Sequence, residues 1–146
     1  MGEIILRITE NELSADLFYE LYISVGWEPP LKEQIAVALN NTIAAFTVYD
    51  DNNNPVAMAR LIGDGGMSYY IKDFAVIPTE QKKGIGTMLM KHIENYIIKN
   101  LKPNWAVSLE LISSKGKEPF YEKMGFEARP CEWDGAGMFK MVRYTN

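Results

Sequence analysis

The spacing of apolar and polar positions along the first part of the chain predicts one strand followed by two helices. Residues 4–9 alternate weakly, as expected for a strand. Ser14 is a suitable N-cap for a helix that should end at Gly26, because glycine readily adopts the backbone conformation that closes a helix. A second, shorter helix is predicted over residues 31–39, after a turn closed by proline.

The middle of the chain predicts three strands and then a long helix. Residues 42–49 and 56–62 are rich in β-branched and apolar side chains and are joined by an Asp/Asn/Pro loop, which is typical of an antiparallel hairpin. A third strand is predicted over residues 67–77 and ends at Pro78. Over residues 84–100 the apolar side chains fall on one helical stripe, so this helix should pack against the sheet.

The last part of the chain predicts a strand over residues 105–112, a short helix over 117–124 closed by Gly125, and a final hairpin made by the residues from Phe126 onward and residues 138–144. A strand, a long helix and a strand in succession imply a right-handed parallel crossover. The predicted fold is therefore mixed α+β: a mostly antiparallel twisted sheet of about six to seven strands, with a central parallel pair and helices on both faces.

Length and composition are those of one ordinary globular domain over residues 1–146, with 47% hydrophobic and 23% charged residues. Fifteen basic and nineteen acidic side chains give a net charge of −4, so nucleic acid is not an expected partner. No basic stretch leads into a long apolar run, so we expect no membrane association and a cytoplasmic location. Cys131, the single cysteine, is expected to be a free thiol.

The turn between the third strand and the long helix is suited to binding an anion. Its sequence is Gln81-Lys82-Lys83-Gly84-Ile85-Gly86-Thr87. Glycines let the backbone approach a phosphate, the first amides of a helix lack intrahelical acceptors, and the helix dipole adds partial positive charge. The turn does not fit the Walker pattern or the dinucleotide fingerprint, and by itself it is equally typical of a tight connection without a ligand.

With its flanking residues, this turn resembles the GNAT superfamily of acetyl-CoA-dependent N-acyltransferases. The residues that match the superfamily's pyrophosphate-binding motif and the strand before it are Phe74, Val76, Gln81, Gly84 and Gly86. Residues 120–126, Phe-Tyr-Glu-Lys-Met-Gly-Phe, match its second motif. The order of predicted elements is also similar to this fold, so the resemblance spans nearly the whole chain.

The resemblance implies acetyl-CoA as the co-substrate and no metal. The main chains of Phe74, Ala75 and Val76 would pair with pantetheine almost as an added strand. The residues that would hold the pyrophosphate, through one side chain and the loop amides, are Gln81, Lys82, Lys83, Gly84, Ile85, Gly86 and Thr87. A backbone N–H near Val76 would stabilise the oxyanion.

The resemblance also implies two catalytic candidates. Tyr121 occupies the place of the tyrosine that in many family members donates a proton to the departing thiolate of coenzyme A. Asp73 is the candidate to bind the acceptor ammonium or relay its proton, because it lies on the strand lining the reaction centre, just before Phe74. A salt-bridged or solvated strand acid is the alternative for Asp73. Some family members carry a catalytic glutamate earlier on this strand, where this chain has Tyr70, so the base stays open.

In this family, several aromatic and acidic residues of the chain would flank the acceptor side, and they are candidates for a pocket that binds an amine. The alternative for each of them is ordinary packing. They are Trp27, Glu28, Tyr69, Tyr70, Glu132 and Trp133. His92, the only histidine, falls on the apolar stripe of the long helix, which favours packing over catalysis. Cys131 has no histidine near it in sequence and is predicted to be a spectator.

Together these features predict an N-acetyltransferase that moves the acetyl group of acetyl-CoA to a primary amine of a small molecule, by direct attack through a tetrahedral intermediate. The alternatives are transfer to an alcohol, transfer of a longer acyl group, and a non-catalytic acyl-CoA-binding regulatory module. Exposed strand edges or the final hairpin would support a homodimer.

Overall fold

A computed structural model describes residues 5–145, which group into two compact units that meet in sequence between Leu111 and Ile112. The elements of the first unit are β1 (Arg7–Glu10), α1 (Ala15–Ser24), α2 (Lys32–Asn40), β2 (Ala44–Tyr49), β3 (Pro55–Gly63), β4 (Ser68–Val76), a 3₁₀ turn (Pro78–Glu80), α3 (Ile85–Asn100) and β5 (Ser108–Leu111). The second unit holds α4 (Glu118–Lys123). The single domain over residues 1–146 stays a prediction.

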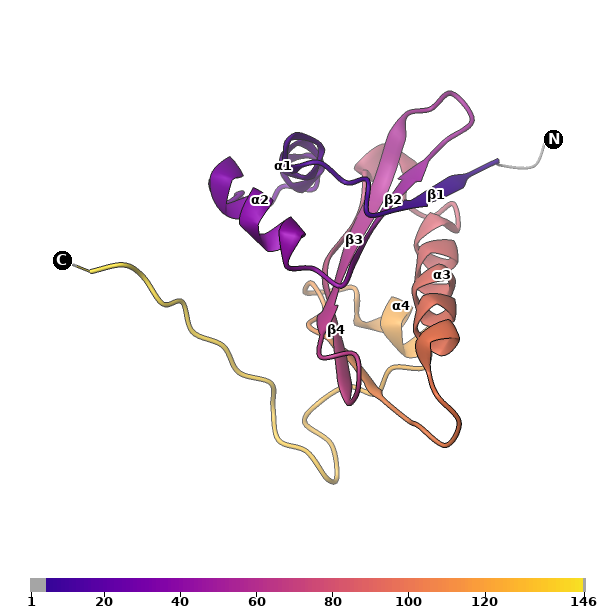
Figure 1. Cartoon of the computed structure of the whole chain (residues 1–146), viewed down its shortest axis with the longest axis vertical. Coiled ribbons are helices and arrows are strands. Elements are labelled where there is room, and N and C mark those ends of the chain that lie inside the picture. The colour runs from indigo at the N-terminus through magenta and orange to yellow at the C-terminus, as the bar shows by residue number, and fades with distance from the viewer. Residues whose placement is uncertain (1–4, 146) are drawn as a thin grey trace. The chain divides into compact units, whose positions relative to one another are not determined.

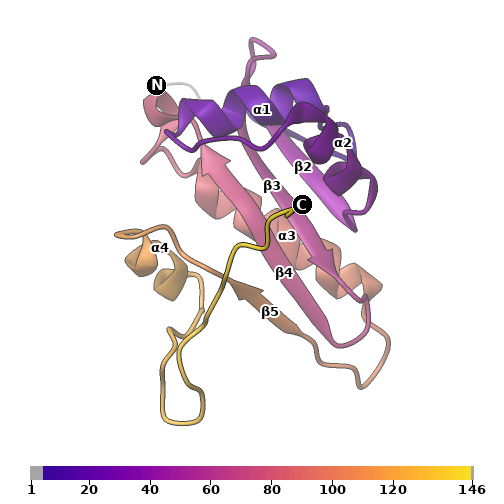
Figure 2. The ribbon, with the colours of Figure 1, turned by 90° about the vertical axis from the view of Figure 1, so that its left-hand side faces the viewer.

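The first unit is built on one mixed sheet with the strand order β1-β2-β3-β4-β5 (Figure 2). The strands β1 to β4 pair antiparallel, and β5 pairs parallel with β4 after the crossover through α3. This confirms the mostly antiparallel sheet with one parallel pair. The described sheet has five strands rather than six to seven, and the parallel pair lies at its edge rather than at its centre.

The predicted final hairpin is wrong for this structure. Over the described residues from Phe126 to the C-terminal side, no strand forms, and residues 138–144 have no regular secondary structure. A strand pattern supplies suitable side chains, but the strand itself needs a neighbouring edge that takes up its backbone N–H and C=O groups. Residues 138–144 therefore have the apolar pattern of a strand without forming one in this structure.

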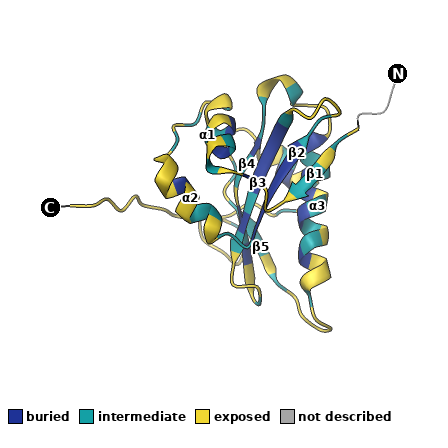
Figure 3. Ribbon diagram, turned by 45° about the horizontal axis from the view of Figure 1, so that its top comes forward, coloured by how far each residue is buried: buried dark blue, intermediate teal, exposed yellow. Residues whose placement is uncertain are grey.

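Helices cover both faces of the sheet, as predicted: α1 and α2 lie on one face and α3 on the other (Figure 1). The apolar residues of the α1 and α2 face are Leu13, Phe18, Leu21, Ile35, Ala45, Met58 and Ala75. Those that α3 buries are Ile85, Leu89, Met90, Ile93 and Ile97. The central strands β2 and β3 are the most deeply buried part of the chain (Figure 3).

Local signals placed the helices well. Ser14 caps α1, since its Oγ accepts a hydrogen bond from the Leu17 amide at 3.1 Å, and Gly26 follows the helix with φ 85°. The strand predicted over residues 4–9 is observed at Arg7–Glu10, and Ile4 lies outside the described residues.

Candidate coenzyme and acceptor site

A β-bulge interrupts β4 at Asp73. Met58 lies opposite Ala75 and Arg60 lies opposite Lys72, so two residues of β4 face one residue of β3. Asp73 has φ 56°, in the left-handed region that Asp adopts more readily than most non-glycine residues. Such a bulge bends a strand and re-aims its side chains.

The ladder between β4 and β5 is short and ends before the bulge. Its last pair is Ile71 and Leu111, whereas β4 continues to Val76. The parallel strands therefore stop pairing at the point where the bulge begins. Residues 74–76, the predicted pantetheine-binding segment, lie beyond the end of this ladder.

Asp73 forms an ion pair with Arg60. Its Oδ2 accepts a hydrogen bond from Arg60 Nε at 2.7 Å, and the two side chains are only 11% and 14% exposed. Arg60 Nη1 also donates to Thr42 Oγ1 at 3.3 Å. Burial raises the pKa of the nearby Tyr22 phenol; the negative charge of Asp73 raises it further, and the positive charge of Arg60 opposes this. Tyr22, Thr42, Arg60 and Asp73 thus form a polar group on the sheet face covered by α1 and α2, which we call the Arg60 cluster.

The structure shows Asp73 in a salt bridge with Arg60, and its role toward the acceptor ammonium stays a prediction. Sequence reasoning missed Arg60, although one signal was available: Arg60 is the only charged residue in the apolar strand β3. A charge in a buried strand is almost always paired. The partner of Arg60 is Asp73, and the bulge in β4 sets the position of Asp73 opposite β3.

The connection from β4 to α3 brings the predicted loop residues together. Gln81 Nε2 donates to the Val76 carbonyl oxygen at 2.9 Å, which ties the start of the loop to the end of β4. Lys82 and Gly84 both have left-handed backbones, with φ 64° and 85°. Gly84 is the N-cap of α3 and no side chain caps this end of the helix.

Space and charge at this loop suit an anion. A Cβ at Gly84 would meet no atom within 4 Å, so the approach to the backbone is open. The amides of the first turn of α3, at residues 85–87, have no intrahelical acceptor, and the helix dipole acts in the same direction. Lys83 Nζ lies 3.1 Å from Glu80 Oε2 in an exposed pair. Alternating backbone conformations of this kind make an anion-binding concavity.

Tyr121 lies on α4, in the second unit. Its ring packs edge-on against Phe120 and Phe126, with centroid distances of 5.1 and 6.0 Å. Burial raises the pKa of its phenol to about 12. Tyr121 is therefore protonated throughout the neutral range, which is the form required of a proton donor.

The acceptor candidates divide between different parts of the chain. Trp27 packs edge-on against Tyr22 of the Arg60 cluster, with 5.0 Å between ring centroids, and Glu28 beside it is exposed. Tyr70 and Lys72 point to the same face of the sheet, and Lys72 Nζ lies 5.9 Å from the centre of the Tyr70 ring. Lys72 lies opposite Arg60 on β3, so these residues share the face of the Arg60 cluster. The structure therefore places Trp27, Tyr70 and Asp73 on one face of the sheet.

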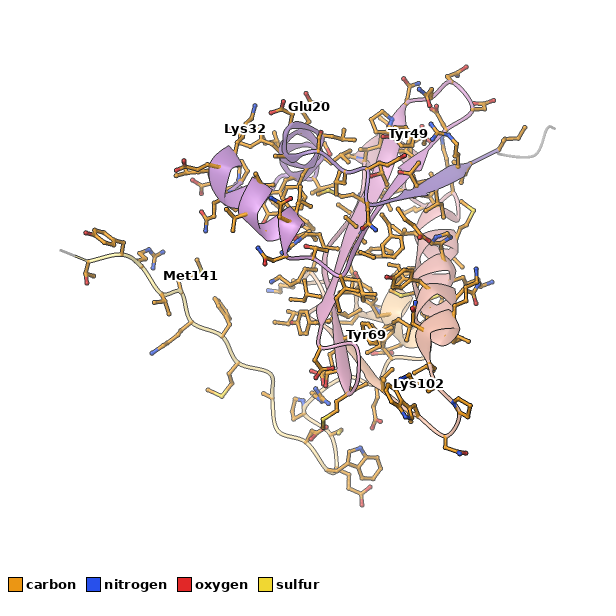
Figure 4. The ribbon with its side chains drawn as sticks, viewed as in Figure 1. Glu20, Lys32, Tyr49, Tyr69, Lys102 and Met141 are labelled. Carbon is orange, nitrogen blue, oxygen red and sulfur yellow. The ribbon has the colours of Figure 1, made fainter. Side chains whose placement is uncertain are left out.

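Tyr69 does not join that group, because neighbouring residues of a strand point to opposite faces. Its side chain is buried on the α3 side of β4 (Figure 4). There it lines a cavity of about 310 Å³ together with Ile43, Gly63 and Tyr96. Burial raises the pKa of Tyr70, and the charge of Glu110 on β5 raises it further. Glu132 and Trp133 lie in the second unit and are exposed.

His92 links α3 to β1. Its Nε2 lies 2.9 Å from Glu10 Oε1, and its ring stands edge-on to Phe46 at 5.5 Å. Among residues 5–145, no three His, Cys, Asp or Glu side chains gather closely enough to hold a metal ion. No helix in the same part of the chain is both long and apolar enough to cross a membrane. Cys131 is a free cysteine.

This fold is that of a known enzyme family. Residues 18–144 match the family model described as the acetyltransferase (GNAT) domain, so the chain belongs to the GNAT family. The chloroplastic GCN5-related N-acetyltransferase 1 of Arabidopsis thaliana is 32% identical over 127 residues, which cover 86% of this chain and 62% of that protein. The chain thus spans about three fifths of the length of this curated relative.

Solved structures agree in fold over almost the whole chain. A Staphylococcus aureus protein described as a probable acetyltransferase has 30% identity and a TM-score of 0.80, covering 96% of this chain and 100% of that one. A GNAT-family acetyltransferase from Streptococcus pneumoniae has 28% identity and a TM-score of 0.77, with the same coverage. These findings confirm the resemblance; the cytoplasmic location stays a prediction.

Proposed function

We propose that this chain is an acetyltransferase that moves the acetyl group of acetyl-CoA to a primary amine of a small molecule. The connection from β4 to α3 carries the proposal: β4 continues past its ladder with β5, and the backbone then turns through Lys82 and Gly84 into the uncapped start of α3. Membership of the GNAT family and relatives named N-acetyltransferases support it.

The residues of this connection fit the pyrophosphate of coenzyme A. The amides of residues 85–87 and the dipole of α3 favour a negative group, and Lys82 and Lys83 add full positive charge nearby. Gln81 is held back on the Val76 carbonyl, so its contribution is to fix the loop. The main chain of residues 74–76 is where we expect pantetheine to pair as an added strand.

Acetyl-CoA supplies an activated thioester. The deprotonated amine attacks its carbonyl carbon, a C–N bond and an oxyanion form, and collapse of this intermediate breaks the C–S bond. A backbone N–H near Val76 would stabilise the oxyanion. Tyr121 would give its proton to the departing sulfur, and its pKa of about 12 keeps that proton in place at neutral pH.

The acceptor amine would lie on the face of the sheet that holds Trp27, Tyr70 and Asp73. Aromatic rings and a carboxylate suit an ammonium group through cation–π and ionic contacts. Because Asp73 already pairs with Arg60, an incoming ammonium would share this carboxylate with the guanidinium. Trp133 stays a further candidate for this pocket.

A thermal-shift comparison of acetyl-CoA, CoA, NAD and ATP tests the proposal first. A ligand at a hundredfold excess over its Kd stabilises by about 2.7 kcal/mol, or roughly 5–10 °C for a chain of this size. We expect a shift with the two CoA ligands alone, followed by thiol release with primary amines. No shift with either CoA ligand would overturn the proposal. Thiol release with alcohols only, or binding without turnover of any acceptor, would favour the O-acetyl or regulatory alternatives.

A further inference from the structure

The two halves of β4 turn their backbone N–H groups in opposite phase. In an antiparallel ladder, every second residue turns its N–H and C=O toward the same neighbouring strand. At the start of β4, the Asp64 amide donates to the Ser68 carbonyl oxygen at 3.1 Å, so the even-numbered residues of this half face β3. Directly after β4, the Ile77 amide donates to the Val56 carbonyl oxygen at 2.9 Å, so the odd-numbered residues of the second half face β3. The bulge at Asp73 separates the two phases.

The bulge therefore decides where the Val76 N–H points. Val76 precedes Ile77, so its N–H faces away from β3, toward the side on which the ladder with β5 has already ended. Without the extra residue at the bulge, the first phase would continue, and the even-numbered Val76 would turn its N–H to β3. The N–H expected to stabilise the oxyanion and the main chain expected to pair with pantetheine would then point in the wrong direction.

Arg60 holds the residue on which the bulge depends. Asp73 has φ 56°, which a residue with a side chain adopts only at a cost in conformational free energy. The contact that offsets this cost is the hydrogen-bonded ion pair, in which Arg60 Nε donates to Asp73 Oδ2 at 2.7 Å. Both side chains are largely buried, so moving the bulge along β4 would leave two charges without their partners.

Arg60 is itself fixed from the other side. Its Nη1 donates to Thr42 Oγ1 at 3.3 Å, and the Thr42 hydroxyl donates in turn to the Ala38 carbonyl oxygen at 2.7 Å. Because Ala38 belongs to the last turn of α2, Arg60 connects this helix with the bulge of β4. A planar guanidinium with donors engaged on both sides has one preferred position, so it can hold Asp73 in one place.

We propose that Arg60 is a positioning residue for acetyl transfer: through Asp73 it fixes the bulge, and the bulge turns the Val76 N–H toward the thioester. This role rests on the proposed function, since acetyl-CoA has to bind along residues 74–76 for the direction of the N–H to matter. In this role Arg60 contacts neither the coenzyme nor the reacting atoms. The role also accounts for a charged residue in the otherwise apolar strand β3.

Hydrogen exchange of backbone amides tests the phase without any ligand. In the wild type, the Ile77 amide donates to β3 and should exchange more slowly than the Val76 amide. In Arg60→Met the ratio of the Val76 rate to the Ile77 rate should fall by at least about tenfold, because protection moves from one amide to the other. The double variant Arg60→Met with Asp73→Asn leaves no unpaired charge, so it tests the same ratio if the single variant folds poorly. An unchanged ratio would overturn the proposal.

CoA binding separates this role from general stability. Calorimetry should give a Kd for CoA at least about tenfold weaker in both Arg60 variants, the loss expected when one or two hydrogen bonds to the ligand are not made. The double variant should regain stability without regaining affinity. Ile35→Ala is the matched control, because it removes a buried side chain from the same face of the sheet and should leave the Kd unchanged.

Two results of the binding experiment would overturn the proposal. One is recovery of CoA affinity together with stability in the double variant, and the other is an equal loss of affinity in Ile35→Ala. A wild type that binds no CoA would instead overturn the proposed function. The exchange rates of Val76 and Ile77 would still decide whether Arg60 sets the phase of β4.

Discussion

At the residue scale, the Arg60 cluster is where charge is most deeply placed in the first unit. Arg60 and Asp73 pair at 2.7 Å with little exposure, and the bulge gives Asp73 the backbone that brings it to Arg60. A pair of this kind adds little over an apolar pair of the same shape, but a single charge left behind is costly. We therefore expect the pair to disfavour any other register of β3 and β4, because a shift would leave one of the two charges buried without its partner.

Removing one member of the pair should cost more than removing both. We expect Arg60→Met to lower the free energy of unfolding by about 3 kcal/mol, because the Asp73 carboxylate then loses its partner. The double variant Arg60→Met with Asp73→Asn should recover part of that loss. Urea unfolding of the wild type, both single variants and the double variant measures the coupling, and equal, additive losses would contradict it.

Thr47 offers a stabilising change. Its side chain is fully buried in β2, and its Oγ1 has no hydrogen-bond partner among the described residues. A buried hydroxyl without a partner costs free energy, so Thr47→Val should raise the free energy of unfolding by about 1 kcal/mol. Thr42→Val is the matched control: it removes a hydroxyl that accepts from Arg60 and should destabilise. Thermal and urea unfolding check both signs.

At the scale of elements, the junction of β4 and α3 combines three features in one short stretch. The ladder with β5 stops, the strand bulges, and the loop delivers the backbone into an uncapped helix. None of these features needs a particular side chain at the point of contact with a phosphate. Binding by such a junction therefore depends on backbone shape, which Gly84 sets with its φ of 85°.

Gly84→Val should separate the role of this shape from general stability. Gly26→Val is the matched control, because Gly26 has the same φ of 85° and a Cβ added there would also meet no atom within 4 Å. Both substitutions should cost about 1–2 kcal/mol of stability through left-handed strain. Only Gly84→Val should weaken CoA binding, by at least about tenfold in calorimetry. Equal Kd values for the two variants would contradict the assignment of the loop.

The position of Tyr121 on α4 gives a kinetic prediction. Tyr121→Phe should slow acetyl transfer by roughly 100-fold or more, the usual contribution of a general acid. Because the phenol pKa is about 12, the wild-type rate should show no loss from Tyr121 ionisation below about pH 11. Rates of thiol release from pH 6 to 11 measure both effects. An unchanged rate in Tyr121→Phe would remove the acid assignment.

At the scale of the whole molecule, ionisation of Tyr121 connects pH with stability. Its pKa is about 12 when folded and near 10 when unfolded, so only the unfolded state loses the proton between these values. The contribution of the protonated Tyr121 phenol to the free energy of unfolding is therefore fully present below about pH 10. It decreases as the pH rises toward 12. The second unit holds this group, and the first unit holds the loop and the Arg60 cluster.

Alkaline unfolding tests this linkage. Two pH units of pKa difference correspond to about 2–3 kcal/mol, which the wild type should lose between pH 10 and 12. The free energy of unfolding of Tyr121→Phe should fall less over the same interval. The other tyrosines of the variant still titrate, but the buried phenol of Tyr121 is absent. Chemical denaturation at pH 9, 10 and 11 gives the two curves. Parallel curves would show that the burial of Tyr121 does not shift its pKa.

The sequence alone determined the features that depend on neighbouring residues. Ser14 and Gly26 bound α1, the apolar stripe defines α3, and the glycine loop between β4 and α3 lies where its motif predicts. These features could be predicted because capping, helical periodicity and the backbone freedom of glycine each act over only a few residues. The parallel pair followed from the crossover rule, which also needs only the order of elements.

Only the tertiary structure decided the features that depend on register and on partners. The bulge at Asp73 and its pairing with Arg60 require a two-against-one alignment of β3 and β4 that no local pattern reports. Tyr69 and Tyr70 are adjacent in sequence but serve opposite faces, and the fold shows which face holds the Arg60 cluster. Residues 138–144 have the sequence of a strand, yet a strand forms only where another edge completes its hydrogen bonds.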